Sequence, residues 1–209
     1  DNQLNSYQLN LISYFKSIAL GFEFDDASKI TRRWETDMNI FVGGNPNDEL
    51  LSELELIKNE INDLTTTEFK LNIVNDSLGS NYYIFFGNRT ETSKVFPGWS
   101  DLTLSNWGLF YIFWNNLNQI NSGYMYVDTQ RPDILGQKHL LREELTQSLG
   151  LARDSYLYDD SIFQQSWTTV TQYSQMDKDI IRLLYHPEME VGLDKTQVED
   201  LLVQILKKE

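Results

Sequence analysis

The sequence predicts an α+β fold, with a twisted mixed sheet of about four or five strands followed by a helical C-terminal part. Three observations support this fold class. Short alternating apolar runs recur through the N-terminal part, one long amphipathic helix interrupts them, and helical spacing takes over from Lys138 onward. Strands and helices do not alternate regularly, which argues against a doubly wound parallel sheet.

The clearest helix is expected over residues 48–64. Behind a potential N-cap at Asn47, apolar residues recur at helical spacing from Leu50 to Leu64, so this helix should pack one face on the sheet. Alternating or aromatic runs predict strands at 38–42, 69–73, 82–86, 107–114 and 123–127. Helical spacing predicts further helices at 4–20, 138–149, 175–185 and 196–206.

The chain is expected to form a single domain over residues 1–209, because it contains no repeat, low-complexity tract or linker. Within it we expect an N-terminal helical extension (1–29), a subdomain with the sheet and the 138–149 helix (30–150), and a C-terminal helical subdomain (151–209).

Charge and composition exclude several classes of function. The formal net charge is −14 and the chain has no basic run, so nucleic acid is not an expected partner. No apolar stretch approaches the roughly 20 residues that span a bilayer, and no basic region leads into an apolar one as in a signal peptide. We therefore expect no transmembrane segment, and a lipid anchor would lie outside these residues.

The residue counts also restrict metal chemistry. The chain has no cysteine, which excludes disulfides and thiolate zinc sites, and it has only two histidines, His139 and His186. A site built from three imidazoles is therefore impossible within one subunit.

The stretch from His139 to Asp154 contains the most informative pattern. Apolar leucines recur every four residues on one face of the expected helix, whereas His139, Glu143 and Gln147 recur at the same spacing on another. Gly150 follows on that polar stripe and predicts a left-handed turn that ends the helix. The three polar side chains should face the segment where the chain folds back.

This layout resembles the metzincin zinc-peptidase signature HExxHxxGxxH. Aligned on Gly150, the sequence has Glu143 and Gln147 at the two helical ligand positions and Glu144 at the general base, so that it reads EExxQxxG. Arg153 stands at the third ligand position, with Asp154 one residue beyond. The resemblance implies a metzincin-like cleft whose histidine ligands have been lost.

Two flanking segments agree with this resemblance. Metzincins bind substrate along an edge strand just before the zinc helix, and the resemblance assigns that role to Gly123, Tyr124, Met125, Tyr126 and Val127. Phe163 stands where a methionine lies in the metzincin Met-turn, and Tyr185 ends a segment similar to the matrixin closing helix. Gly150, Phe163 and Tyr185 are therefore expected to be structural residues.

Three motifs in order, EExxQxxG, DSIF and LLYHPxMxxG, also resemble a bacterial family of uncharacterised lipoproteins and exported proteins, over about residues 30–193. This resemblance implies an extracytoplasmic location, in the cell envelope or secreted. It implies no particular activity.

Three functions are compatible with these residues. The first is a catalytically degenerate protein that binds a peptide or protein in the former active-site cleft and has no cofactor. The second is an active metal-dependent hydrolase with Glu144 as general base and a divalent cation (Zn, Ca, Mg or Mn) on Glu143, Gln147 and His139 or Asp154. The third is an envelope scaffold without a ligand.

Overall fold

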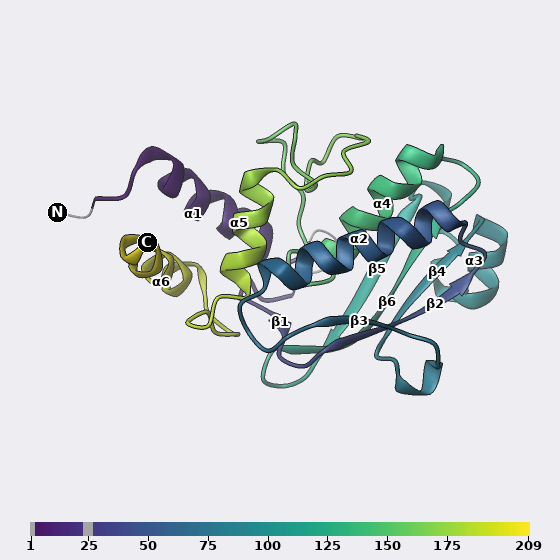
Figure 1. Ribbon diagram of the computed structural model, residues 1–209, viewed down its shortest axis with the longest axis horizontal. Coiled ribbons are helices and arrows are strands. Elements are labelled where there is room, and N and C mark those ends of the chain that lie inside the picture. The colour runs from purple at the N-terminus through teal and green to yellow at the C-terminus, as the bar shows by residue number, and fades with distance from the viewer. Residues whose placement is uncertain (1–2, 23–26) are drawn as a thin grey trace.

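The computed structural model describes residues 3–22 and 27–209. Its elements form a sheet with helices on one face and at one end (Figure 1), and Phe96 and Trp99 pack on the other face. The expected extension 1–29 includes residues 1–2 and 23–26, which lie outside the described residues. The strands are β1 (Arg33–Trp34), β2 (Met38–Gly44), β3 (Leu71–Val74), β4 (Tyr82–Gly87), β5 (Gly108–Trp114) and β6 (Gln119–Asp128). The α-helices are α1 (Ser6–Ala19), α2 (Asp48–Leu64), α3 (Arg89–Val95), α4 (Ile134–Gln147), α5 (Gln175–Leu184) and α6 (Lys195–Lys208). Short 3-10 turns lie at Ser77–Gly79, Pro97–Trp99 and Leu102–Leu104.

The sheet is mixed and confirms the predicted α+β class. Its order is β1-β6-β4-β2-β3, with all neighbours on this path parallel, and β5 pairs antiparallel with β6 on the other side. The sheet has six strands, one more than the upper expectation, because a two-residue β1 pairs beside the start of β6.

The prediction that residues 123–127 form an edge strand is wrong. The segment from Gly123 to Val127 lies in β6, with β4 on one side and β5 on the other, so its backbone is paired on both sides. The edge is β5 instead, because the hairpin through Asn118 (φ 63°) folds β5 onto the outer side of β6. Burial explains the arrangement: Met125, Tyr126 and Val127 are all buried, as in a strand covered on both faces.

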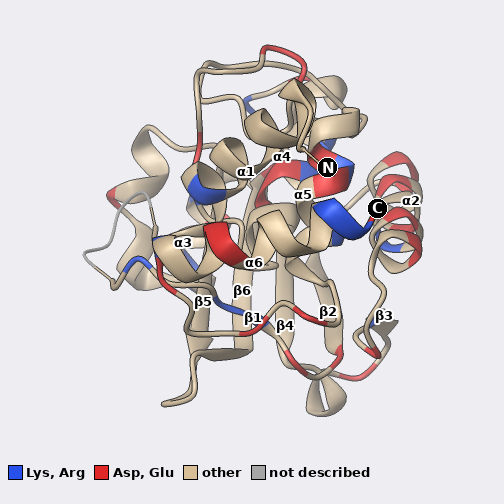
Figure 2. Cartoon of the chain, turned by 90° about the vertical axis from the view of Figure 1, so that its left-hand side faces the viewer, with Lys and Arg blue, Asp and Glu red and all other residues tan. Residues whose placement is uncertain are grey.

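Helix α2 begins and ends where the sequence predicts. The Asn47 side chain accepts from the N–H of Leu50, and the apolar face of Leu50, Leu54, Ile57 and Ile61 is fully buried. Its other face is acidic, and Figure 2 shows Asp and Glu gathered along it. The helix therefore packs between the core and solvent as an amphipathic helix should.

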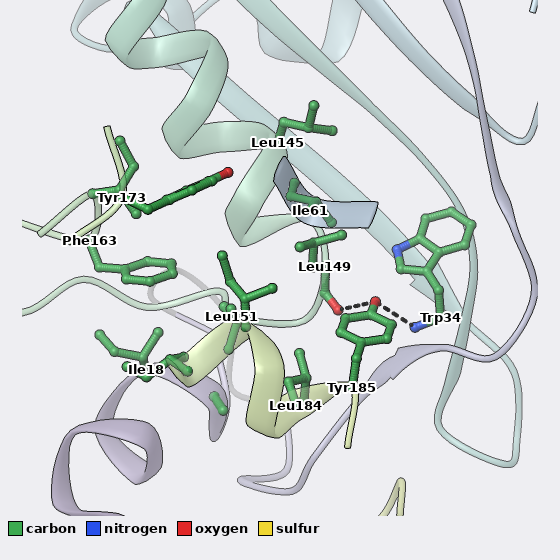
Figure 3. Close-up of a cluster of buried hydrophobic side chains, with 14 of the residues drawn as sticks. Ile18, Trp34, Ile61, Leu145, Leu149, Leu151, Phe163, Tyr173, Leu184 and Tyr185 are labelled. Atoms are coloured by element: carbon green, nitrogen blue, oxygen red, sulfur yellow. Dashed lines mark hydrogen bonds between the residues drawn. The ribbon is translucent and has the colours of Figure 1, made fainter. Parts of the chain in front are cut away.

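One core cluster joins the sheet to helices from both ends of the chain. Helix α1 packs on α5 and α6 at one end of the molecule (Figure 1). The close-up in Figure 3 shows side chains from α1, α2, α4, α5 and the turn after α4 meeting there: Ile18, Ile61, Leu145, Leu184 and Leu149. Among the helices formed by the described residues, none has the length and apolar character needed to cross a membrane.

The turn after α4 has the geometry predicted for Gly150, whose φ is +113°. A Cβ built on this glycine would lie 2.0 Å from the Arg32 carbonyl oxygen. Two further contacts hold the turn: the Trp34 indole donates to the Ser148 carbonyl (2.9 Å), and the Tyr185 hydroxyl donates to the Leu149 carbonyl (3.1 Å; Figure 3). The turn thus joins α4 to β1 and to the end of α5.

The substitution Gly150→Ala should lower the free energy of unfolding by more than the roughly 1–2 kcal/mol that a left-handed backbone costs an L-residue, because the Arg32 carbonyl must also move. Urea denaturation of both proteins measures the difference. The matched control is Gly98→Ala, where a Cβ meets nothing within 4 Å, and this change should stay within about 0.5 kcal/mol. Equal midpoints for Gly150→Ala and the wild type would contradict the prediction.

Candidate functional site

A cleft of about 670 Å³ lies between the edge strand β5 and helix α4. Its walls come from β5 with the residues just before it, the polar face of α4, part of the chain between Ala152 and Trp167, and Phe22. In the part of the chain that the structure describes, β5 pairs with β6 alone, so its other edge faces this cleft.

The register of the hairpin shows which backbone groups of β5 point outward. The Asp128 N–H donates to the Trp107 carbonyl (2.8 Å), and these two residues are directly opposite each other in the register. Hydrogen-bonded pairs alternate along an antiparallel ladder. The N–H and C=O groups of Gly108, Phe110 and Ile112 therefore point to the free edge.

Helix α4 presents three faces to three environments. Asp133 caps its first turn by accepting from the Gly136 N–H (2.9 Å), so the helix begins four residues earlier than predicted. The predicted ridge of Leu141, Leu145 and Leu149 is buried in the core. His139, Glu143, Glu144 and Gln147 all line the cleft.

The third face of α4 is fixed by Arg142. Its buried guanidinium donates to Glu53 of α2 (2.7 Å), pairs with Glu60, and lies over the Tyr173 ring at 4.6 Å. These contacts point Arg142 away from the cleft. They also set the rotation of α4 about its axis, which determines the residues that face β5.

His139 and Glu143 form a pair on the cleft side of α4. The Nε2 of His139 lies 3.3 Å from Glu143 Oε2, and its Nδ1 lies 2.7 Å from the Val170 carbonyl oxygen. His139 is only 1 % exposed. Burial alone would lower the pKa of His139, but the hydrogen bond and charge of Glu143, helped by the Val170 carbonyl, raise the pKa above its ordinary value.

Gln147 and Asp154 form a second pair, one turn further along α4. The Gln147 amide donates to the Asp154 carboxylate across the Gly150 turn. Arg153, which the alignment placed at the third ligand position, reaches instead toward the Leu20 carbonyl (3.5 Å). Asp154 is therefore the residue that the turn brings against the polar face of α4.

Glu144 lies between α4 and β5, against Gly108. Its residue is 8 % exposed, and a Cβ built on Gly108 would come within 2.5 Å of Glu144 Oε1. The absence of a side chain at Gly108 thus leaves room for the carboxylate. Together with burial, the charge of Glu144 raises the pKa of Tyr82, whose hydroxyl contacts Ser148.

The Asp-Ser-Ile-Phe turn is held by a buried carboxylate on α5. Asp177 accepts from the Ser161 hydroxyl (2.6 Å) and from the Ile162 N–H (3.0 Å). Phe163, at the position where the resemblance expects methionine, and Tyr185 both have no exposed surface. Burial raises the pKa of Asp177 in spite of its hydrogen bonds.

The structure brings five of the predicted site residues to one cleft: His139, Glu143, Glu144, Gln147 and Asp154. It does not bring the predicted β6 segment there, because β5 lies between that segment and the cleft. The predicted site residues did not include the aromatic residues of the cleft walls, among them Phe22, Trp107, Phe110, Trp114 and Trp167. The alternation in Gly108–Trp114 was a signal for a half-buried edge strand.

Among the described residues, the structure contains no group of three or more His, Cys, Asp or Glu side chains that could hold a metal ion. The potential donors in the cleft contact one another instead. His139 is engaged through both ring nitrogens, and Gln147 is engaged with Asp154. A cation entering this cleft would have to displace these contacts.

Comparisons with known proteins identify a family and two distant structural likenesses. The family described as "Protein of unknown function (DUF2927)" matches residues 8–204. A solved structure of myroilysin shows a TM-score of 0.43 and 10% identity, covering 75% of this chain and 83% of that chain. A crystal structure of myroilysin shows a TM-score of 0.45 and 10% identity, covering 88% and 97%. No curated protein matches the chain.

The pKa of His139 should be above its ordinary value of about 6.5, and Glu143→Gln should lower it. Because the folded pKa is raised, the stabilisation from this pair is complete below the unfolded value of about 6.5 and is lost as pH rises through the folded value. NMR titration of the imidazole protons measures the pKa of His139, because the chain has only two histidines to distinguish. His186→Gln assigns the two signals, and a His139 pKa below 6.5 would contradict the prediction.

Proposed function

We propose that this chain, which belongs to the DUF2927 family, binds an extended peptide or protein segment in the cleft between β5 and α4. The observation that carries this proposal is the edge of β5 that faces the cleft and, among the described residues, pairs with no strand. A strand added there would pair with the outward groups of Gly108, Phe110 and Ile112. Its side chains would alternate between the floor formed by α4 and the solvent side.

The side-chain contacts in the cleft favour binding over zinc-dependent hydrolysis. Zinc sites in proteins use imidazole and thiolate, usually with three or four protein ligands. This chain offers the cleft one imidazole, and that imidazole is paired with Glu143 and the Val170 carbonyl. The amide of Gln147 is a poor substitute for a second imidazole. The donor set does not fit a zinc site, so we derive no catalytic step from one.

The purified protein should therefore contain no stoichiometric zinc. Elemental analysis after dialysis without chelator measures this, and hydrolysis of denatured casein is assayed in parallel with added Zn²⁺, Mn²⁺, Mg²⁺ or Ca²⁺. Glu144→Gln is the matched variant, because it keeps the size of the side chain and removes the base. One zinc per chain together with Glu144-dependent cleavage would replace this proposal by the active-hydrolase alternative.

If a peptide adds to β5 as a further strand, its binding should require the backbone N–H of Phe110. Phe110→Pro removes an N–H that points to the free edge and leaves the ladder to β6 intact, so it should weaken peptide binding about tenfold. Phe110→Ala is the control, because it removes the ring but keeps the N–H. The probe is a peptide selected on the wild-type protein from a displayed library of random sequences about ten residues long, which is enough to cover β5.

Isothermal titration of that peptide with the three proteins gives the affinities, and thermal melting confirms that each variant is folded. Loss of binding in Phe110→Pro alone supports strand addition. Equal affinity for Phe110→Pro and the wild type would mean that the peptide does not pair with β5, and the proposal would fail.

A further inference from the structure

A row of aromatic side chains crosses the sheet face opposite α2 and α4, here called the outer face. The strand registers place Phe41 of β2 beside Tyr83 of β4, and Tyr83 beside Tyr124 of β6. Tyr124 is in turn directly opposite Tyr111 of β5. Because side chains at opposed positions share one face of a sheet, the row runs across four strands and ends at Tyr111, on the edge.

Neighbouring rings in this row stack on one another. The ring centroids of Phe41 and Tyr83 lie 5.8 Å apart with 18° between the ring planes, and those of Tyr124 and Tyr111 lie 6.0 Å apart at the same angle. Between these pairs, Phe96 stacks on Tyr124 with a centroid distance of 4.8 Å. Stacked rings at these distances attract each other. Each ring is therefore held by its neighbour, but Tyr111 has a neighbouring strand, among the described residues, only on the β6 side.

The exposure of the side chains shows that the apolar surface of the outer face is open at this edge. Tyr111 is 46% exposed and Phe113 is 44% exposed, whereas Tyr83 and Tyr124 are half-buried. The rings of Tyr111 and Phe113 lie side by side, with centroids 5.0 Å apart. Two adjacent exposed rings thus stand at the place where a further strand would add.

The sequence of β5 lacks the residues that usually protect an exposed edge. Soluble proteins prevent pairing at sheet edges with charged side chains and with proline, and Gly108–Trp114 contains neither. The ladder to β6 has a register shift between Phe113 and Trp114, so the regular part of the edge runs from Gly108 to Phe113. This regular part is suited to pair with another strand.

A strand that pairs with this edge would extend the aromatic row. The backbone groups of Phe110 and Ile112 point to the edge, so Tyr111 lies between two positions that would bond to the added strand. In an antiparallel ladder the residue opposite Tyr111 then belongs to a non-hydrogen-bonded pair, in which side chains come closest. Its side chain would lie beside Tyr111 on the outer face, and the residues before and after it would point into the cleft.

We propose that the segment bound along β5 carries an aromatic or β-branched side chain opposite Tyr111, and that this side chain packs on the exposed rings of Tyr111 and Phe113. An aromatic residue forms favourable cross-strand pairs with another aromatic residue or with a β-branched one. This inference rests on the proposed function, because it names the class of segment that the β5 edge accepts. It assigns part of the sequence preference to the outer face of the sheet, outside the cleft.

The first experiment is selection from the displayed random peptide library on the wild type, on Phe110→Pro and on Tyr111→Lys. The wild type should enrich an aromatic or β-branched residue at one aligned position, and Phe110→Pro should not enrich these peptides. Tyr111→Lys should change the preference at that position to Asp or Glu, because opposite charges form favourable cross-strand pairs. The matched control is Leu78→Lys, at a residue that is 92% exposed in the Ser77–Gly79 turn, and it should keep the wild-type consensus.

The outcomes separate this inference from the proposed function. A wild-type consensus without an aromatic or β-branched position, or one that Tyr111→Lys leaves unchanged, would overturn the inference; the proposed function would stand if Phe110→Pro still loses the peptides. The same enrichment on Phe110→Pro would overturn the proposed function itself. A dimer in sedimentation analysis that Phe110→Pro abolishes would make a second copy of the chain the occupant of the edge, and would also overturn the inference.

The second experiment is a double-mutant cycle measured by titration calorimetry. Tyr111→Ala should bind the selected peptide about threefold more weakly than the wild type does, as expected for one lost cross-strand pair. The two proteins should bind alike a peptide analogue with alanine at the consensus position. Leu78→Ala is the control and should leave both affinities unchanged.

Equal losses for the peptide and its alanine analogue in Tyr111→Ala would show that the consensus side chain does not contact Tyr111, and would overturn the assignment. Thermal melting of each variant excludes unfolding as the cause. If Tyr111→Ala is unstable, Tyr111→Thr gives the same comparison, because threonine favours the strand conformation and also lacks the ring.

Discussion

The backbone turn at Gly150 fixes the position of most other parts of the structure. At this one place the chain leaves α4, passes against the Arg32 carbonyl, and accepts side-chain hydrogen bonds from Trp34 and Tyr185. These contacts come from β1 and from the end of α5, which are far from α4 in sequence. Because a side chain at this position would collide with the Arg32 backbone, the turn requires glycine. This turn also brings Asp154 against the polar face of α4.

The side of α4 that faces the core and the side that faces the cleft make separate sets of contacts. The leucine ridge and Arg142 bind the helix to the core and to α2, and they set its rotation. Glu143 and Gln147 instead contact His139 and Asp154 on the cleft side. Substitution at Glu143 or Gln147 can therefore change the chemistry of the cleft while the helix stays in place. This separation is a physical reason why the polar face of α4 can vary while the fold is retained.

The sequence predicted local structure well and tertiary neighbours poorly. Helix α2 and its Asn47 cap followed from apolar spacing, and the Gly150 turn followed from the end of the polar stripe. The order of β5 and β6 could not be derived from spacing, because either strand of a hairpin can be outermost. Helix α3 was missed although its Asn88–Glu91 capping box is visible in the sequence.

The contacts of the site residues were the least predictable, because their partners lie far along the chain or across a turn. His139 was expected at a helix start, yet α4 begins at Ile134, and the Val170 carbonyl from a distant loop holds its second nitrogen. Buried polar groups need partners whether or not a metal is present. The pairs His139–Glu143 and Gln147–Asp154 meet this need with side chains alone. The same pairing fixes the orientation of the cleft floor beneath β5, so the free strand edge faces a surface that is already ordered before any ligand arrives.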